Sequence, residues 1–300
     1  MPELPDLTVY IEHLDRRVTG ETLRDIRLAS PFVLRTVSPS IEEMRGRVVT
    51  GLRRIAKQIV FELDGGCFVV IHLMIAGRLH WHAAGKALTK RGHGRSALAA
   101  FDFDPGTLLL TEASRKKRAS LRLVDGEAAL AALDPGGLEI FATDLAGFVR
   151  RLRDSRHTLK RTLTDQRIFA GIGNAYSDEI LLHAGLSPFK RARDMTDEEA
   201  ARLHDACTAT LTDWTERLRA KAGDTFPAKV TAFHAEMAAH GRYRKPCPVC
   251  GAPIQRIIRA ENESNYCARC QTGGRVLADR SLSRLLRETW PKRIEELEGH

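Results

Sequence analysis

Residues 240–271 read HGRYRKPCPVCGAPIQRIIRAENESNYCARCQ and contain the most specific pattern of the chain. Two Cys-x-x-Cys pairs, Cys247 with Cys250 and Cys267 with Cys270, are separated by sixteen residues. Each pair on a tight turn directs two thiolates at one point, and two pairs complete a closed tetrahedral shell for zinc. Because four sulfur ligands leave no position for water, we expect one structural zinc ion in a module that does no chemistry itself.

The chain is basic, with a formal net charge of +9 over 300 residues. This charge favours a polyanionic partner, and nucleic acid before membrane, because neither end shows a strongly amphipathic basic helix. The alternative is a basic surface that binds nothing. The N-terminus lacks the apolar core of a signal peptide, and no apolar run approaches the ~20 residues that span a bilayer. We therefore expect a cytoplasmic protein, in a bacterial-type cytosol, with no membrane partner. We also expect a monomer.

The N-terminal part of the chain predicts a helix followed by an antiparallel β-sandwich or flattened barrel. The first residues show helical spacing at Leu7, Ile11 and Leu14, and Pro5 suits a first helical turn. Short β-like runs then follow. They are Arg47–Gly51, Ile59–Leu63, Cys67–Met74, Leu98–Phe103, Thr107–Thr111 and Ser120–Val124.

The rest of the chain is helical in character apart from the metal module. Residues 127–220 are helical, with apolar residues at helical intervals in Glu198–Leu218. After the metal module, Ser281–Leu297 predicts an amphipathic helical tail that is broken at Pro291. The fold class is therefore α+β and multidomain.

Basic side chains gather in two places. The run Arg115-Lys116-Lys117-Arg118, with Arg122, lies between two β-like runs and predicts a loop or hairpin tip. A charge run is usually a solvated face, but several runs beside glycine-rich turns favour contact with nucleic acid in a basic chain with a zinc module. The second group leads into residues 163–186 and comprises Arg150, Arg151, Arg153, Arg156, Lys160 and Arg161.

Residues 159–188 read LKRTLTDQRIFAGIGNAYSDEILLHAGLSP and predict two helices joined by a glycine turn. Asn174 can cap the second helix, which would leave backbone N–H groups around Gly173 free for a phosphate. On its own, a Gly-x-Gly-Asn turn between helices is a weak functional signal.

The PELPD stretch at residues 2–6, this turn and the two cysteine pairs together resemble the formamidopyrimidine-DNA glycosylase/endonuclease VIII family. The resemblance covers nearly the whole chain in sequence order. Its matching segments are Pro2–Leu14, Arg53–Lys57, His72–Leu79, Leu159–Pro188 and His240–Gln271.

The resemblance implies a division of the chain into four parts. An N-terminal helix and catalytic β-sandwich would occupy residues 1–135, and a helix–two-turn–helix DNA-binding domain would occupy 136–235. A zinc β-hairpin would follow at 236–275, and a helical tail at 276–300.

The resemblance also implies the catalytic residues. In that family the initiator methionine is removed, and the amine of the N-terminal proline, here Pro2, attacks C1′ of the damaged nucleotide. A free α-amine has a pKa near ~8, so part of it is neutral near physiological pH, and a secondary amine can form an iminium adduct. Glu3 matches the carboxylate that protonates the opening deoxyribose. Lys57 matches the lysine that holds a phosphate beside the lesion, and Asn174 matches the phosphate-binding asparagine.

Three positions depart from the family pattern. The arginine that grips the lesion phosphate from the zinc hairpin is replaced by Asn262, with Arg259 as a possible substitute. In the family, an Arg-Arg-Phe sequence at a strand tip inserts into the duplex as a wedge and contacts the opposite base. Here it is replaced by residues 114–118, which contain no aromatic side chain. The methionine that fills the void left by the extruded base aligns with Ile75, and Met74 is adjacent.

The sequence therefore predicts a base-excision-repair DNA glycosylase with abasic-site lyase activity. It would remove damaged bases through a Schiff base to Pro2, nick the strand by β- and δ-elimination, and favour single-stranded or open DNA. The main alternative is a non-catalytic, structure-specific DNA-binding protein on the same scaffold. A zinc-ribbon transcription factor would explain the metal module but not the N-terminus.

Overall fold

The computed structural model describes residues 1–85, 94–227, 230–231, 233–259, 262–278 and 291–298. Contacts divide the chain into two compact units, which we describe separately. One is Met1–Pro135 with Trp214–Thr231, and the other is Gly136–Asp213 with Ala232–His300. The four-part division expected from the sequence is finer and stays a prediction. In the described part of the chain, no helix is both long and apolar enough to cross a membrane.

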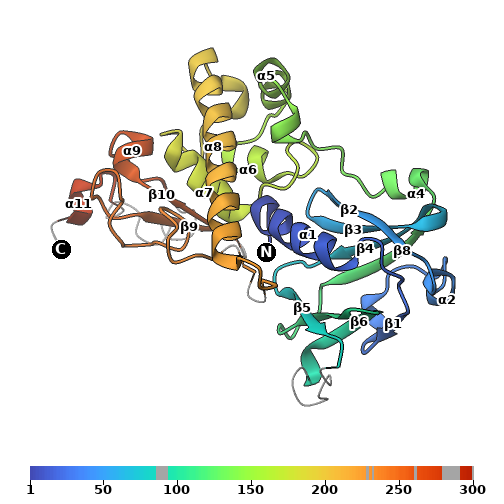
Figure 1. The fold of residues 1–300 in the computed structure, drawn as a ribbon. Helices are drawn as coiled ribbons and strands as arrows, with labels where there is room; N and C mark the ends of the chain where they lie inside the picture. Colours follow the sequence, from blue (N-terminus) through green and yellow to red (C-terminus); the bar gives the residue numbers. More distant parts are fainter. Residues whose placement is uncertain (86–93, 228–229, 232, 260–261, 279–290, 299–300) are drawn as a thin grey trace. The chain divides into compact units, whose positions relative to one another are not determined.

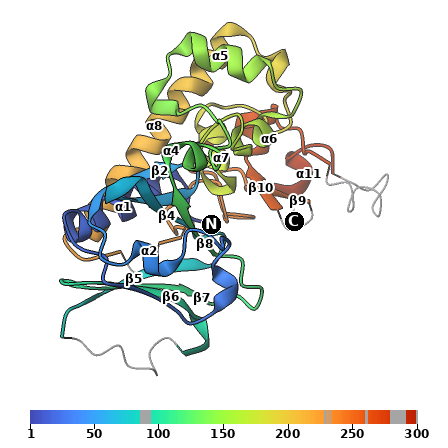
Figure 2. The same ribbon diagram turned by 90° about the vertical axis from the view of Figure 1, so that its right-hand side faces the viewer.

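The first unit is built on two four-stranded antiparallel sheets that face each other (Figures 1 and 2). Side chains alternate along β4, so that Val69 and Ile71 lie in the core shared by both sheets, while Phe68 and Val70 pack on the opposite face beside Leu130. The antiparallel β-sandwich is thus confirmed. The first sheet has the order β1 (Asp25–Leu28), β6 (Ala97–Phe103), β7 (Gly106–Glu112), β5 (Gly77–Ala83), and the second β2 (Val49–Ile55), β3 (Gln58–Leu63), β4 (Cys67–His72), β8 (Ser120–Asp125).

The predicted N-terminal helix is present as α1 (Leu4–Val18) (Figure 1). Leu7, Tyr10 and Leu14 are fully buried in the sandwich core, as their spacing of three and four residues requires. Glu3 is the N-cap, and its backbone N–H donates to Asp6 Oδ2 at 2.8 Å. This capping arrangement fixes the chain where Pro2 enters the helix. Short helices α2 (Ile41–Met44) and α4 (Glu127–Ala131) and the C-terminal part of α8 (Asp197–Ala222) complete the unit.

The second unit contains helices and a small metal module. The helices are α5 (Leu145–Arg153), α6 (Leu159–Thr164), α7 (Asn174–His183) and the N-terminal part of α8 (Asp197–Ala222). The module contains the hairpin β9 (Gln255–Arg259) and β10 (Asn262–Tyr266), followed by α9 (Ala268–Thr272). The α+β, multidomain fold class is therefore confirmed.

Several element predictions need correction. The strand expected at Cys67–Met74 ends at His72, because Met74 has φ 52°, outside the β region. Strands β1 and β5 were not predicted: β1 has only four residues, whereas polar and apolar side chains alternate along β5, a pattern that does indicate a half-buried edge strand. The predicted tail at Ser281–Leu297 lies mostly outside the described residues; its described end contains α11 (Glu295–Glu298).

Candidate active site and nucleic-acid interface

The N-terminus is enclosed by the first unit. Pro2 is buried and Glu3 is only 2% exposed. Burial lowers the pKa of the Met1 α-amine; the nearby Glu3 and Asp6 oppose this effect, whereas Arg78 and Lys57 add to it. An amine with a lowered pKa is more often neutral and nucleophilic near physiological pH. The fold therefore places the terminal amine among charged side chains in a desolvated setting.

Lys57 reaches this setting from a tight hairpin. Ile55 pairs with Gln58, so Ala56 and Lys57 form the two-residue turn between β2 and β3. Ala56 has φ 49°, and its carbonyl accepts a hydrogen bond from Arg54 Nη1 at 2.5 Å. Lys57 is only 5% exposed, and its charge acts on the Met1 amine. The structure thus places Glu3 and Lys57 close enough to the N-terminal amine for their charges to act on it.

The loop after β4 carries the two apolar candidates, Met74 and Ile75. The Met74 N–H donates to His72 Nδ1 at 3.0 Å, which holds Met74 in its left-handed conformation. Burial lowers the pKa of His72 to about 4, and the charges of Lys57 and Arg122 contribute. His72 is therefore neutral near pH 7 and accepts this hydrogen bond. Ile75 is 53% exposed, and Met74 is partly buried.

The basic run at residues 115–118 forms a loop between β7 and β8, as predicted. Glu112, 1% exposed, organises the loop: its carboxylate accepts hydrogen bonds from the backbone N–H groups of Arg118 (2.8 Å) and Ala119 (2.9 Å). Ser114 Oγ also donates to this carboxylate at 2.8 Å. Arg115, Lys116 and Arg118 are exposed on the ordered loop, and their contact with DNA stays a prediction.

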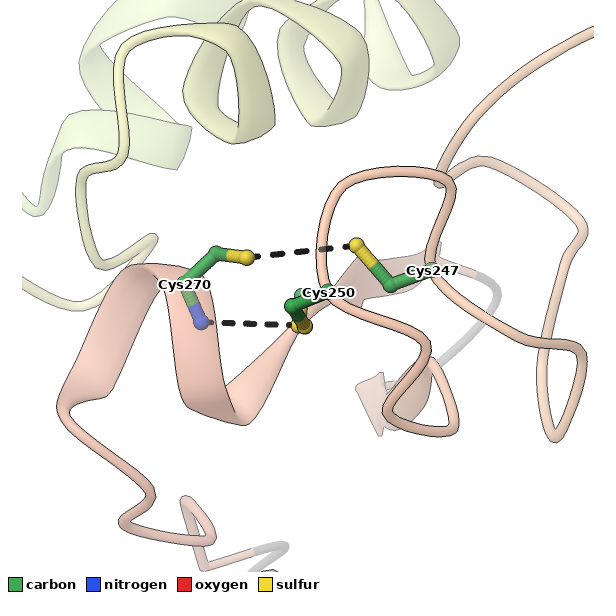
Figure 3. Close-up of side chains that lie close together, drawn as sticks. Cys247, Cys250 and Cys270 are labelled. Atoms are coloured by element: carbon green, nitrogen blue, oxygen red, sulfur yellow. Dashed lines mark hydrogen bonds between the residues drawn. The ribbon is translucent and has the colours of Figure 1, made fainter.

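The four predicted zinc ligands converge in the second unit. Their sulfur atoms all lie within 4.8 Å of one another, and the Cys247 and Cys270 sulfur atoms, 3.9 Å apart, point toward each other (Figure 3). The sulfur atoms of Cys250 and Cys267 are 3.4 Å apart. In a tetrahedron with Zn–S bonds of about 2.3 Å, sulfur atoms are about 3.8 Å apart. The thiolates therefore fit one structural zinc ion, and the prediction of the cofactor is confirmed.

The turn between α6 and α7 differs from expectation. Gly173 is the N-cap of α7, and Asn174 is its first helical residue, so the prediction that Asn174 caps the helix is wrong. The Gly171 N–H donates to Gln166 Oε1 at 2.9 Å, and Gln166 Nε2 donates to the Ile172 carbonyl at 2.7 Å. The turn is thus fixed by Gln166, and the Gly171 N–H is not left open for a phosphate. The Asn174 side-chain amide has no hydrogen-bond partner within the described ranges.

Lys160 lies inside the unit rather than on its surface. Its ammonium group is 2.6 Å from Asp178 Oδ1 and donates to the Asn174 carbonyl at 2.5 Å. Because this ammonium group is already paired with a carboxylate and a carbonyl, Lys160 holds the turn in this structure, and its contact with DNA stays a prediction. Asp178 is fully buried and also lies 2.8 Å from His240 Nδ1, at the start of the metal module.

Glu179 joins the same helix to the metal module, a contact that was not predicted from the sequence. Its carboxylate accepts from the backbone N–H groups of Ala238, Ala239 and His240, at 2.8, 2.8 and 2.9 Å. Adjacent acidic residues in a helix usually indicate a solvated face. Only the three-dimensional contacts reveal that Asp178 and Glu179 are buried and bonded to the module.

Arg259 and Asn262 occupy paired positions at the ends of β9 and β10. The side chains of both residues lie outside the described part of the structure. Their role in gripping a phosphate therefore stays a prediction.

Three matches cover most of the chain. Residues 1–120 match the formamidopyrimidine-DNA glycosylase N-terminal domain, 134–222 the helix–two-turn–helix domain of that protein, and 244–273 the zinc finger found in this glycosylase and in isoleucyl-tRNA synthetase. Formamidopyrimidine-DNA glycosylase of Thermus thermophilus is 34% identical over 285 residues, covering 91% of this chain and all of the relative. That of Heliobacterium modesticaldum is also 34% identical, over 284 residues, covering 90% of this chain and all of the relative.

Solved structures agree with these matches. The crystal structure of MutM (Fpg) from Thermus thermophilus has 31% identity and a TM-score of 0.74, covering 90% of this chain and 98% of the other. The Lactococcus lactis glycosylase bound to DNA containing an abasic site has 23% identity and a TM-score of 0.76, covering 90% of this chain and 99% of the other, and this likeness concerns the fold. The chain therefore belongs to the formamidopyrimidine-DNA glycosylase family.

Proposed function

We propose that this DNA glycosylase of base-excision repair uses the amine of Pro2, after removal of Met1, as its nucleophile. The observation that carries the proposal is the enclosed N-terminus, where burial lowers the pKa of the terminal amine beside Glu3 and Lys57. A free secondary amine formed at the same place would be neutral in a larger fraction of molecules than one in water.

The reaction follows from this placement. The amine nitrogen attacks C1′ of the damaged nucleotide and forms a new C–N bond. The glycosidic bond between C1′ and the base breaks, and the base leaves with a proton. Opening of the sugar at the C1′–O4′ bond leaves an iminium ion between C1′ and Pro2. The iminium acts as an electron sink, so a proton is lost from C2′ and the 3′ phosphate departs. Loss of the 5′ phosphate by δ-elimination follows.

Glu3 would supply the proton that O4′ takes up when the sugar opens. The carboxyl group is next to the nucleophile in sequence, is buried, and belongs to the residue that caps α1. The rigid helix start thus holds acid and nucleophile in a fixed relation, which a flexible terminus could not do.

Lys57 and Asn174 would hold backbone phosphates beside the lesion while the base is extruded. The ammonium group of Lys57 is held at a two-residue turn, and the Asn174 amide lies at the start of α7, where backbone dipoles favour an anion. Their positive or polar ends attract phosphate without reading the base. Structures of related proteins include complexes with DNA, which supports DNA as the partner.

The substrate would be damaged or abasic DNA in single-stranded or open form. The Arg115–Arg118 loop offers charge but no aromatic ring to stack in the place of an extruded base. Where the bases are already unstacked, the lack of an aromatic wedge should reduce activity little, because no stacking has to be replaced. We also propose that the protein acts as a monomer in the cytosol.

Borohydride trapping tests this proposal against the non-catalytic alternative. Protein lacking Met1 is mixed with DNA containing an abasic site, and the reductant converts an iminium into a stable covalent bond. We expect a covalent complex that disappears when Met1 or a tag is retained. A protein that binds this DNA but forms no adduct would instead support the structure-specific binding protein.

A further inference from the structure

The metal module carries a cluster of cations around Tyr243 that the catalytic scheme does not use. The Arg256 guanidinium carbon lies 4.4 Å from the centroid of the Tyr243 ring, and that of Arg244 lies 5.2 Å from it. The ring quadrupole attracts both cations and offsets part of their mutual repulsion. We call Tyr243, Arg244 and Arg256 the arginine–tyrosine cluster.

The backbone at Arg244 is in a conformation that favours glycine. Arg244 has φ 65°, in the left-handed region. Two hydrogen bonds hold the turn in place: the Arg244 N–H donates to the Ile254 carbonyl at 2.9 Å, and the Ile254 N–H donates to the Lys245 carbonyl at 2.9 Å. Glycine would adopt this turn without strain, so an arginine here costs stability. Backbone strain of this kind is characteristic of functional positions.

The positive charge of the cluster is barely neutralised. Among the residues that the structure describes, Arg244 has no carboxylate partner, and it is exposed. Arg256 has Glu263 at 3.6 Å, with both side chains about one-third exposed, and such surface pairs are weak. Lys245 is an additional exposed cation beside the cluster. The cluster therefore presents guanidinium donors to solvent.

We infer that the arginine–tyrosine cluster binds phosphates of the DNA backbone. Guanidinium groups match phosphate oxygens with paired hydrogen bonds, and Tyr243 holds two of them close together in advance. The inference rests on the proposed function only in taking DNA as the ligand. It also fits the replacement of a hairpin arginine by Asn262, because the module would then grip the backbone through other cations.

The test compares the salt dependence of DNA binding between matched variants. The variants are Arg244→Gly and Arg256→Gln, and the control is Arg275→Ala, which removes an exposed arginine of the same module. Binding to a labelled duplex with a stable abasic-site analogue is measured by fluorescence anisotropy over a range of NaCl concentrations. In each cluster variant, the negative slope of log K against log salt should become shallower by about 1. Binding should weaken equally on different sequences. The control should leave the slope unchanged.

Stability and trapping complete the design. Arg244→Gly relieves the left-handed strain, so its thermal midpoint should be equal to or above that of the wild type, and misfolding cannot explain its loss of binding. At saturating protein and low salt, borohydride trapping by the control Arg275→Ala should equal that of the wild type. If the wild type itself forms no adduct, the proposal that Pro2 is the nucleophile fails. The salt dependence of binding still tests the phosphate site in that case. Unchanged slopes in both cluster variants, or an equal loss in Arg275→Ala, would overturn the phosphate site.

Discussion

Glu3 combines two tasks at the scale of a single residue, because it caps α1 and is also the nearest carboxyl group in sequence to the proposed nucleophile. Replacing Glu3 with Gln keeps an acceptor for the helix cap but removes the acid. We expect single-turnover base excision to fall about 10²- to 10⁴-fold, the usual contribution of a general acid or base. Circular dichroism should show an unchanged fold, and excision at the wild-type rate would contradict the role.

His72 predicts a pH dependence of stability. Its pKa in the folded protein, about 4, is below the ordinary value of 6.5, so between these values the unfolded chain binds more protons. The stabilisation is complete above pH 6.5 and is lost as the pH falls toward 4, by an amount on the order of 3 kcal/mol. Urea unfolding of His72→Gln should show a shallower decrease over this window. An identical pH dependence in both proteins would show that His72 is not responsible.

Residue types and spacing were enough to predict some site residues but not their neighbours. Pro2 and Glu3 stand in a short, recognisable motif, and the zinc cysteines have a spacing that few other structures use. The acceptor role of His72 depends on the left-handed turn at Met74, and the sequence pattern carries no signal for that conformation.

At the scale of elements, periodicity predicted the strands that have a clear apolar face. Strand β3 contains the apolar run Ile59–Phe61 and was predicted within one residue of its observed start. Strand β5 was missed although polar and apolar side chains alternate along it, because the strands were predicted from mostly apolar runs. The buried contacts of Asp178 and Glu179 were also missed, since helical spacing shows which residues share a face but not what covers it.

The metal module gives a prediction at this scale. Because zinc ligation contributes free energy to folding, chelation should unfold the region around the four cysteines and weaken DNA binding. The change can be followed by thermal unfolding and anisotropy, with re-addition of zinc as the control. Cys207→Ser, at a buried cysteine outside the metal set, should retain one zinc per chain. Correctly folded, active protein without bound zinc would contradict this assignment.

At the scale of the whole molecule, the net charge of +9 favours binding to the DNA backbone irrespective of sequence, and the lack of an aromatic ring in residues 114–118 leads us to expect a preference for open DNA. Affinity should depend strongly on salt, with log affinity falling by about 0.9 per phosphate neutralised on duplex DNA and about 0.7 on single strands. Discrimination between opposite bases should be weak, because charge alone does not read a base.

Single-turnover rates on one lesion test this preference. The lesion is placed opposite each of the four bases in duplex DNA and also in a single strand. We expect similar rates opposite all four bases, good activity in the single strand, and poor excision of 8-oxoguanine from intact duplex. A strong preference for 8-oxoguanine opposite cytosine would show that other residues replace the missing wedge.

The identity of the atom that bonds to the DNA tests the central claim most directly. The borohydride-reduced complex with abasic DNA is digested with nuclease and protease, and the modified peptide is sequenced by mass spectrometry. The account predicts a sugar remnant on the nitrogen of Pro2, in a peptide that begins at this residue. A remnant on a lysine side chain such as Lys57 or Lys116, with Pro2 unmodified, would contradict it.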